Sequence, residues 1–298
     1  MGGRLGVAAE PRSVTDGELA ELEALPGSGT WSVDGHEVRL TNLDKVLFPS
    51  GATKRDLIRH YASIAPLIIP HLADRATNLH RYPDGVGPGR GFWQKDLWPR
   101  TPEWVHRWTF HHENGARSTY AVIDRPATLV WLAQEAAVEL HPWTSPIDAP
   151  HQPTAALIDI DPGETTTWDD VLTLARLFRA ALDHVGIVGF PKVTGRRGIQ
   201  VSVPIAPGYS FEQTRTWVET LSRAIGATVP DLVSWKWSRR ARGGRARLDY
   251  TQNAINRTIV APYSVRSSPN ASVATPIRWD ELEDPELRPD RWTMATIL

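Results

Sequence analysis

Two aspartates stand one residue apart at the end of an apolar run, in the stretch ALIDIDPGE over residues 156–164. The run is typical of a strand buried on both faces, where a charge is costly unless it is paired or binds a metal. Positions i and i+2 of a strand share a face, so Asp159 and Asp161 aim both carboxylates at one spot. A divalent cation would relieve their repulsion; the alternative is that one aspartate only caps the following turn.

A third carboxylate, Asp249 in RLDYTQN, lies between a basic run and an apolar strand. Hard oxygen ligands favour Mg²⁺ or Mn²⁺, and two such ions about 3.5–4 Å apart can activate a hydroxyl and stabilise a leaving phosphate. The alternative is an ion pair with Arg245 or Arg247. Asp159, Asp161 and Asp249 are therefore a candidate site for two ions.

Two arginine-rich stretches are candidates for contacts to phosphate. The run SRRARGGRARLDY has five arginines between residues 239 and 247 and glycines that let the backbone bend. Such a run suits phosphate contacts, but it is also typical of a solvated loop. The turn TGRRG over residues 194–198 could cradle a triphosphate with backbone N–H groups and two guanidinium groups, or it is a plain hairpin turn.

Aromatic residues among cations are candidates for stacking on nucleobases. Phe92 and Trp93, in GRGFWQKD, fit this pattern. Most of the thirteen tryptophans belong to the core, and Trp235 and Trp237 are expected to be packed there too. His141, in VELHPW, is read as a buried structural histidine unless its strand neighbours the aspartate strand.

Composition restricts the class of protein. The 298 residues carry a formal net charge of −1, so a polyanionic partner would have to bind a locally basic surface. The absence of cysteine excludes disulfides, thiolate metal ligands and a cysteine nucleophile. No apolar run approaches the roughly 18 residues of a membrane span, so we expect a cytoplasmic protein without a membrane partner.

The elements that must position these residues alternate between strands and helices. After the aspartate strand, Thr166 and Asp169 resemble a capping box at the start of a helix. Strands over residues 187–193 and 199–205 follow, and then a second helix. We expect an α+β fold, two halves around a central mixed sheet, with residues 1–30 as an extension outside the core and residues 31–298 as one catalytic domain.

Together the motifs resemble the polymerase domain of bacterial ligase D, a member of the archaeo-eukaryotic primase superfamily. The resemblance covers about residues 31–298 and depends on the following stretches: LTNLDKVLFPSGATK, RYPDG, FWQK, VELHPW, DIDPGE, LDYTQN and APYSVR. Without a ligase or nuclease segment, the sequence resembles the stand-alone actinobacterial relatives, including the ligase C-associated primase-polymerases. The resemblance implies a primase-polymerase fold with an RRM-like catalytic half flanked by helices.

The resemblance also implies roles for individual residues. It implies a catalytic group formed by Asp159, Asp161 and Asp249, which bind metal, and His141, which lies near the primer end. It implies nucleotide contacts by Thr194, Arg197, Gln200, Arg242, Gln252 and Arg266. It implies DNA contacts by Lys45, Lys54, Arg81, Phe92 and Trp93. The two lysines would hold a 5′-phosphate at a recessed end; the alternative is that both are solvated surface charges.

One position departs from the family pattern. The family motif is approximately S-G-x-K-G-x-H, and this chain has TGRRGIQ, with Thr194, Arg197 and Gln200. Threonine keeps the hydroxyl and arginine keeps the charge, but glutamine cannot become cationic as histidine can. Triphosphate handling and ribose preference are therefore the properties least safely transferred.

The expected function is a metal-dependent nucleotidyltransferase that adds nucleotides, with NTP preferred over dNTP, to primer ends at gaps or broken DNA ends with a 5′-phosphate. Primase activity is a further implication of the resemblance. The expected partners are such DNA, an ATP-dependent ligase of the C or D type and an end-binding protein, near the nucleoid. One alternative is a non-catalytic DNA-end binder that supports a ligase, and another is a phosphatase or nuclease that uses the D-x-D pair.

Overall fold

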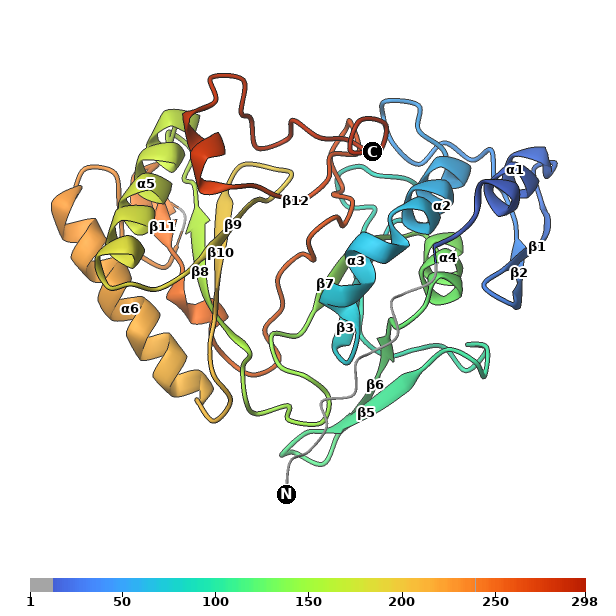
Figure 1. Ribbon diagram of the computed structural model, residues 1–298, viewed down its shortest axis with the longest axis horizontal. Helices are drawn as coiled ribbons and strands as arrows, with labels where there is room; N and C mark the ends of the chain where they lie inside the picture. Colours follow the sequence, from blue (N-terminus) through green and yellow to red (C-terminus); the bar gives the residue numbers. More distant parts are fainter. Residues whose placement is uncertain (1–12, 239) are drawn as a thin grey trace.

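Two lobes, each with its own β-sheet, face each other across the molecule (Figure 1). The computed structural model describes residues 13–238 and 240–298. Each lobe has a separate hydrophobic core, so the chain buries its apolar side chains in two main clusters. None of the helices in the described ranges is long and apolar enough to cross a membrane.

The C-terminal lobe carries the two aspartates of the opening motif. Its five-stranded sheet has the order β11-β8-β10-β9-β12, and every pairing in it is antiparallel. The strands are β8 (Ala155–Asp161), β9 (Phe190–Val193), β10 (Ile199–Pro204), β11 (Arg247–Leu248) and β12 (Thr275–Pro276). The helices are α5 (Trp168–His184) and α6 (Phe211–Thr228), which cover the outer face. The sequence β8-α5-β9-β10-α6-β11 is a βαββαβ unit, and its sheet is RRM-like.

Capping boxes start the long helices of this lobe. The side chain of Thr167 accepts from the backbone of Asp170, whose carboxylate accepts from the backbone of Thr167. The helix thus starts one residue later than the pair Thr166 and Asp169 predicted. The reason is that the Thr166 hydroxyl accepts from the N–H of Gly163 at 3.0 Å and closes the turn after β8 instead.

The N-terminal lobe is built around β3 (Ala76–Arg81). The strand pairs with β7 (Ala137–Pro142) on one edge and shares its other edge between β6 (Arg117–Val122) and β4 (Phe92–Gln94), while β5 (Arg107–His111) pairs with β6. Its helices are α2 (Lys54–Ser63), α3 (Ala65–Leu72) and α4 (Pro126–Gln134). All nine residues of α4 are buried, as expected for an apolar helix enclosed by α2 and the sheet.

Part of the expected N-terminal extension packs on this lobe. Helix α1 (Asp16–Ala24) and the hairpin of β1 (Gly29–Val33) and β2 (His36–Leu40) lie at its edge. Leu22 is fully buried in the lobe core, and Arg55 donates to the carbonyls of Leu22 and Leu25. The expectation that residues up to 30 stay outside the core is thus wrong for residues 13–30, because α1 supplies an apolar side chain and carbonyls that α2 binds. Residues 1–12 lie outside the described ranges.

The expected α+β class and the RRM-like half are confirmed, but in place of one central mixed sheet the described residues form two five-stranded antiparallel sheets and the separate β1–β2 hairpin. A segment after residue 253 connects the two five-stranded sheets: it pairs with Trp143 at Thr258, donates from Ala261 to Leu140, and returns to β9 through β12. Residues of both lobes therefore meet along one interface.

Candidate active site

A row of side chains crosses the C-terminal sheet at the end of β8. In the register, Gln200 of β10 is opposite Asp159, and Lys192 of β9 is opposite Gln200. On the other side, the N–H of Asp249 donates to the carbonyl of Asp159 at 2.8 Å, directly after β11 pairs with β8. Residues opposite each other in a sheet point to the same face. The sheet therefore places Asp249, Asp159, Gln200 and Lys192 side by side.

Asp159 is the acid opposite Gln200. Burial first, and the charges of Asp249 and Asp161 in addition, raise the pKa of its carboxyl group to about 7 against the opposing effect of a hydrogen bond from Gln200. The Nε2 group of Gln200 donates to Asp159 Oδ1 at 3.0 Å. An acid whose ionised form is disfavoured by neighbouring acids is the electrostatic condition that a bound cation would relieve.

The other two acids have polar partners on the opposite side. Arg242 Nη1 donates to Asp161 Oδ2 at 2.8 Å. Asp249 accepts from the hydroxyl of Thr251 at 2.6 Å and from Gln252 Nε2 at 3.1 Å. Its ion pair with Arg247, at 3.2 Å, was the alternative to metal binding weighed from the sequence. Of the two arginines considered as ion-pair partners of Asp249, Arg247 makes the pair. This ion pair does not exclude metal binding by Asp249.

The donor set fits a hard divalent cation in its chemistry. Three carboxylates from two adjacent strands project from one face, and oxygen ligands of this kind suit Mg²⁺ or Mn²⁺. As they stand, no group of three His, Asp or Glu side chains in residues 13–238 and 240–298 is arranged to hold an ion. Arg242 and Thr251 each donate a hydrogen bond to one of these carboxylates. Metal binding by these acids stays a prediction.

A cavity of about 400 Å³ opens beside the aspartates. Five of the six residues predicted to contact a nucleotide line it together with Asp159 and Asp161: Thr194, Arg197, Gln200, Arg242 and Arg266. Arg196 also lines it, so four arginines surround the space. Gly198 is required here, because a side chain would approach the carbonyl of Ile160 to 2.5 Å. Gln252 lies outside the lining, against Asp249.

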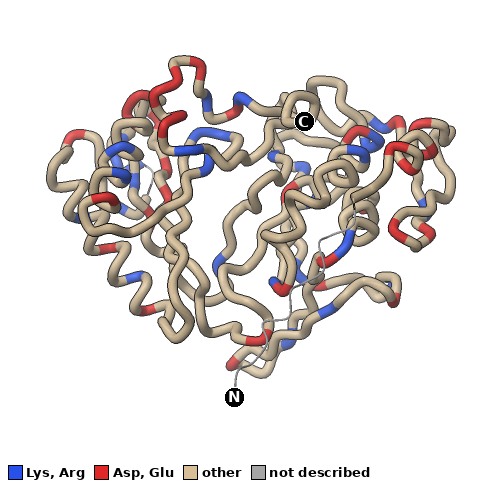
Figure 2. The backbone as a smooth tube through the Cα atoms, viewed as in Figure 1, with Lys and Arg blue, Asp and Glu red and all other residues tan. Residues whose placement is uncertain are grey.

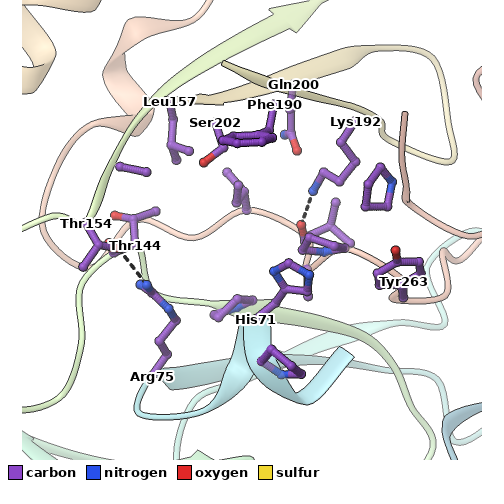
Figure 3. Close-up of a pocket in the computed structure, with 18 of the residues that line it drawn as sticks. His71, Arg75, Thr144, Thr154, Leu157, Phe190, Lys192, Gln200, Ser202 and Tyr263 are labelled. Carbon is purple, nitrogen blue, oxygen red and sulfur yellow. Dashed lines mark hydrogen bonds between the residues drawn. The ribbon is translucent and has the colours of Figure 1, made fainter. Parts of the chain in front are cut away.

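A second cavity, of about 460 Å³, continues the gap between the lobes on the other side of Gln200. Figure 3 shows Gln200 and Lys192 reaching into it from the sheet and His71 from α3. Lys192 is 6% exposed and donates to the carbonyl of Val260, and burial lowers its pKa to about 7. Most of the other lining residues are apolar, and Arg75 is the arginine among them, against four arginines in the first cavity.

Sequence reasoning missed Glu139, the buried carboxylate that connects the lobes. It lies 2.8 Å from His141 Nε2, 3.2 Å from Arg196 and 3.5 Å from Arg266. Burial alone would raise the pKa of Glu139, but hydrogen bonds from His141 and His80 and the charge of Arg266 hold it well below its usual value. The signal in the sequence was a glutamate two residues before His141, on the same face of a buried strand.

His141 lies in the strand next to β3, not beside the aspartate strand. Burial lowers its pKa to about 4, so it is neutral at pH 7. A carboxylate only accepts, so Nε2 carries the proton toward Glu139 and Nδ1 is left as an acceptor. The sequence analysis would have favoured an active-site role for His141 if its strand lay next to the aspartate strand, and the strand pairing does not place it there. Glu139 nevertheless links His141 to Arg196 and Arg266 of the cavity.

The aromatic pair on β4 is exposed, as predicted. Phe92 is 44% and Trp93 is 53% exposed. Trp93 stacks flat on His80, with ring centroids 4.4 Å apart, and meets His141 edge-on at 4.7 Å. Arg81 is 8% exposed and lies under Phe92, with its guanidinium bonded to Gln94 and to Glu135. Arg81 thus packs beneath the exposed aromatic ring of Phe92, and its guanidinium is engaged by protein groups and not exposed for a DNA contact.

The two predicted lysines are neighbours. The N–H of Lys54 donates to the carbonyl of Lys45 at 2.9 Å, where the chain turns into α2. Burial lowers the pKa of Lys54, Glu135 opposes this, and the charges of Lys45 and Arg81 lower it further. A cluster of cations that repel one another is suited to binding an anion. Figure 2 shows the distribution of charge along the chain, with Lys and Arg in blue.

Comparison with known proteins gives one consistent result. Residues 53–298 match the family model described as LigD, primase-polymerase domain. The multifunctional non-homologous end joining protein LigD of Mycolicibacterium smegmatis is 34% identical over 262 residues, 87% of this chain and 34% of that protein. The bifunctional LigD of Bacillus subtilis is 29% identical over 264 residues, 88% of this chain and 42% of that protein. The chain thus spans about a third to two fifths of the length of these relatives.

A solved structure agrees. The polymerase domain of Mycobacterium tuberculosis ligase D in complex with DNA matches with a TM-score of 0.78 and 32% sequence identity, covering 87% of this chain and 92% of that one. The family model extends over both lobes and includes every predicted site residue from Lys54 onward. The chain therefore belongs to the family of LigD primase-polymerase domains.

Proposed function

We propose that this protein is a metal-dependent nucleotidyltransferase that adds ribonucleotides or deoxyribonucleotides to primer 3′ ends at short gaps or broken DNA ends. The observation that carries the proposal is the position of Asp249, Asp159 and Asp161 on one face of the sheet, beside a cavity lined by four arginines. Acids that suit a cation and arginines that suit a polyphosphate are the two requirements of nucleotidyl transfer.

Asp159, Asp161 and Asp249 would hold two Mn²⁺ or Mg²⁺ ions, which would supply Lewis-acid stabilisation of the charge on the reacting phosphate. The protein's own residues bind and orient the nucleotide. Arg266 and Arg197, with the hydroxyl of Thr194, would donate hydrogen bonds to its phosphates in the cavity. Gln200 keeps Asp159 in place through its amide and, being neutral, adds no charge of its own.

The N-terminal lobe would bind the DNA. Phe92 and Trp93 offer exposed ring faces for template bases, and base–aromatic stacking is tolerant of sequence. Lys45 and Lys54 would hold the 5′-phosphate of a gap or broken end. One relative is described in complex with DNA and the others as end joining proteins. We extend that to this chain as a proposed role in DNA repair, in cooperation with an ATP-dependent DNA ligase.

The proposal is tested with a gapped duplex carrying a 5′-phosphate, Mn²⁺ and labelled NTP. Asp159→Asn keeps the size of the side chain and should abolish nucleotide addition, while Asp183→Asn, on the outer helix α5, should leave it unchanged. Full activity in Asp159→Asn would refute the assignment of the site. Comparing NTP with dNTP in the same assay determines the sugar preference.

A second candidate, a non-catalytic binder of DNA ends, is favoured by Gln200, which stands where the family motif has histidine. It predicts binding of 5′-phosphorylated ends without extension under any metal ion. Wild-type protein that binds the gapped duplex but adds no nucleotide with either Mn²⁺ or Mg²⁺ would favour this candidate over the enzyme.

A further inference from the structure

Trp237 lies open to solvent beside the acids, although the sequence favoured packing. The residue is 70% exposed, the highest value among the exposed tryptophans of the described ranges, and Trp235 is 36% exposed. Trp237 belongs to the loop between α6 and β11, whose far end leads into Asp249. Single exposed apolar residues are common on protein surfaces, so exposure alone does not indicate a ligand, and the contacts of this ring decide the question.

One face of the indole is backed by a cation from the site. The guanidinium of Arg247 lies 4.2 Å from the centroid of the Trp237 ring, and the same guanidinium donates to Asp249 Oδ1 at 3.2 Å. The Arg247 side chain is only 7% exposed, so it cannot turn away easily. The ring is thus fixed on one face, and its other face is open.

A second arginine ties the same residue to a second acid. Arg242 Nη2 donates to the carbonyl of Trp237 at 3.4 Å, and Arg242 Nη1 donates to Asp161 at 2.8 Å. Two acids of the proposed metal site are therefore each connected to Trp237 through one arginine. Trp235 provides the contrast: its ring also lies near an arginine, Arg223, but that arginine pairs with Glu219 on α6.

We propose that the open face of Trp237 stacks on a nucleobase at the 3′ end of the strand that is extended. The inference rests on the proposed function and adds a contact on the C-terminal lobe. The 3′ end must reach the acids, and Trp237 is the exposed ring attached to them, whereas Phe92 and Trp93 lie on the other lobe. The exposed cations Lys236, Arg240 and Arg245 in the same loop complement the phosphates of that strand.

The test uses 2-aminopurine as the 3′-terminal base of the primer in a gapped duplex, without metal or nucleotide. Stacking on an aromatic ring quenches its fluorescence. We expect quenching on binding by the wild type, its loss in Trp237→Ala, and its retention in Trp237→Phe and in the matched control Trp235→Ala. Anisotropy should show roughly tenfold weaker binding for Trp237→Ala, since base–aromatic stacking contributes about 1–3 kcal/mol per base.

Three results would overturn the inference. Unchanged quenching and affinity in Trp237→Ala would show that the ring does not touch the primer. An equal loss in Trp235→Ala, or an equal loss in Trp237→Phe, would show that loop packing and not stacking is responsible. If the wild type bound no DNA, the proposed function itself would be contradicted. If the wild type bound DNA without any dependence on Trp237, only the stacking inference would be contradicted.

Discussion

The two lobes contribute to the site in different ways. In the C-terminal lobe, the polar side chains of the site follow the register of one antiparallel sheet: Asp249, Asp159, Gln200 and Lys192 stand in a row because their strands pair. In the N-terminal lobe, Trp93 meets the ring of His141 edge-on, and the buried carboxylate of Glu139 is hydrogen-bonded to His141.

The difference separates reaction chemistry from binding. The sheet of the C-terminal lobe places three acids close together, and burial first and their like charges second raise the pKa of Asp159. The N-terminal lobe instead compensates its buried acid, and it exposes the rings of Phe92 and Trp93 and the side chain of Lys45 to solvent. We infer that the C-terminal lobe carries the reaction and the N-terminal lobe carries most of the DNA, with Trp237 as the exception.

The largest effect should come from an acid of the C-terminal lobe. Asp249→Asn should lower nucleotide addition by about three orders of magnitude, because metal ions supply several kcal/mol of transition-state stabilisation. Trp93→Ala should cost only about tenfold, through DNA affinity. Single-turnover extension of a gapped duplex measures both. If Trp93→Ala were as damaging as Asp249→Asn at saturating DNA, the division between the lobes would be wrong.

A large effect on stability is expected at Glu139. Removing one member of a buried ionic network leaves the others uncompensated, so Glu139→Ala should lower the free energy of unfolding by about 3–5 kcal/mol at pH 7. Its pKa is held below the usual value, so this contribution is present above the unfolded pKa and is lost as the pH falls through the folded pKa. Urea unfolding at pH 7 measures the change.

Glu283, in an exposed pair with Arg176, supplies the control for that experiment. Glu283→Ala should change the unfolding midpoint little, because exposed pairs are screened by solvent. A Glu139→Ala variant as stable as Glu283→Ala would contradict the interpretation that Glu139 ties the lobes together.

A moderate effect is expected at the departure from the family motif. Gln200→His should strengthen NTP binding at pH 6, by about threefold to tenfold, because imidazolium adds a positive charge to the cavity. The gain should fade by pH 8, where histidine is neutral. KM for NTP at the two pH values is the readout. A gain that is the same at both would show that charge is not the missing property.

The smallest effect should come from the lysines of the N-terminal lobe. Lys45→Ala should weaken binding to a 5′-phosphorylated gap by about threefold, the scale of one exposed charge contact, and should have no effect on the same duplex with a 5′-hydroxyl. Competition binding with the two duplexes measures this discrimination. Equal losses on both duplexes would assign the lysine to general DNA affinity.

Features that depend on strand periodicity could be predicted from the sequence. The i and i+2 spacing placed Asp159 and Asp161 on one face, and the turn motif TGRRG brought Thr194 and Arg197 to the same cavity. Other features depend on contacts between distant segments. Glu139 meets Arg266 only because the segment after residue 253 returns along β7, and no local pattern encodes that path. Trp237 was expected in the core because most tryptophans pack there, and no local sequence pattern predicts its exposed position in the loop.

Titration of Mn²⁺ binding to the wild type by electron paramagnetic resonance, at pH 8 and at pH 6, tests whether Asp159 and its neighbouring acids form a metal site. The carboxyl group of Asp159 has a pKa of about 7, so it is ionised at pH 8 and mostly protonated at pH 6. Binding should therefore be tight at pH 8, weaker at pH 6, and lost at both in Asp159→Asn. Mn²⁺ binding that is independent of pH and unchanged in Asp159→Asn would contradict the assignment of the metal site to these acids.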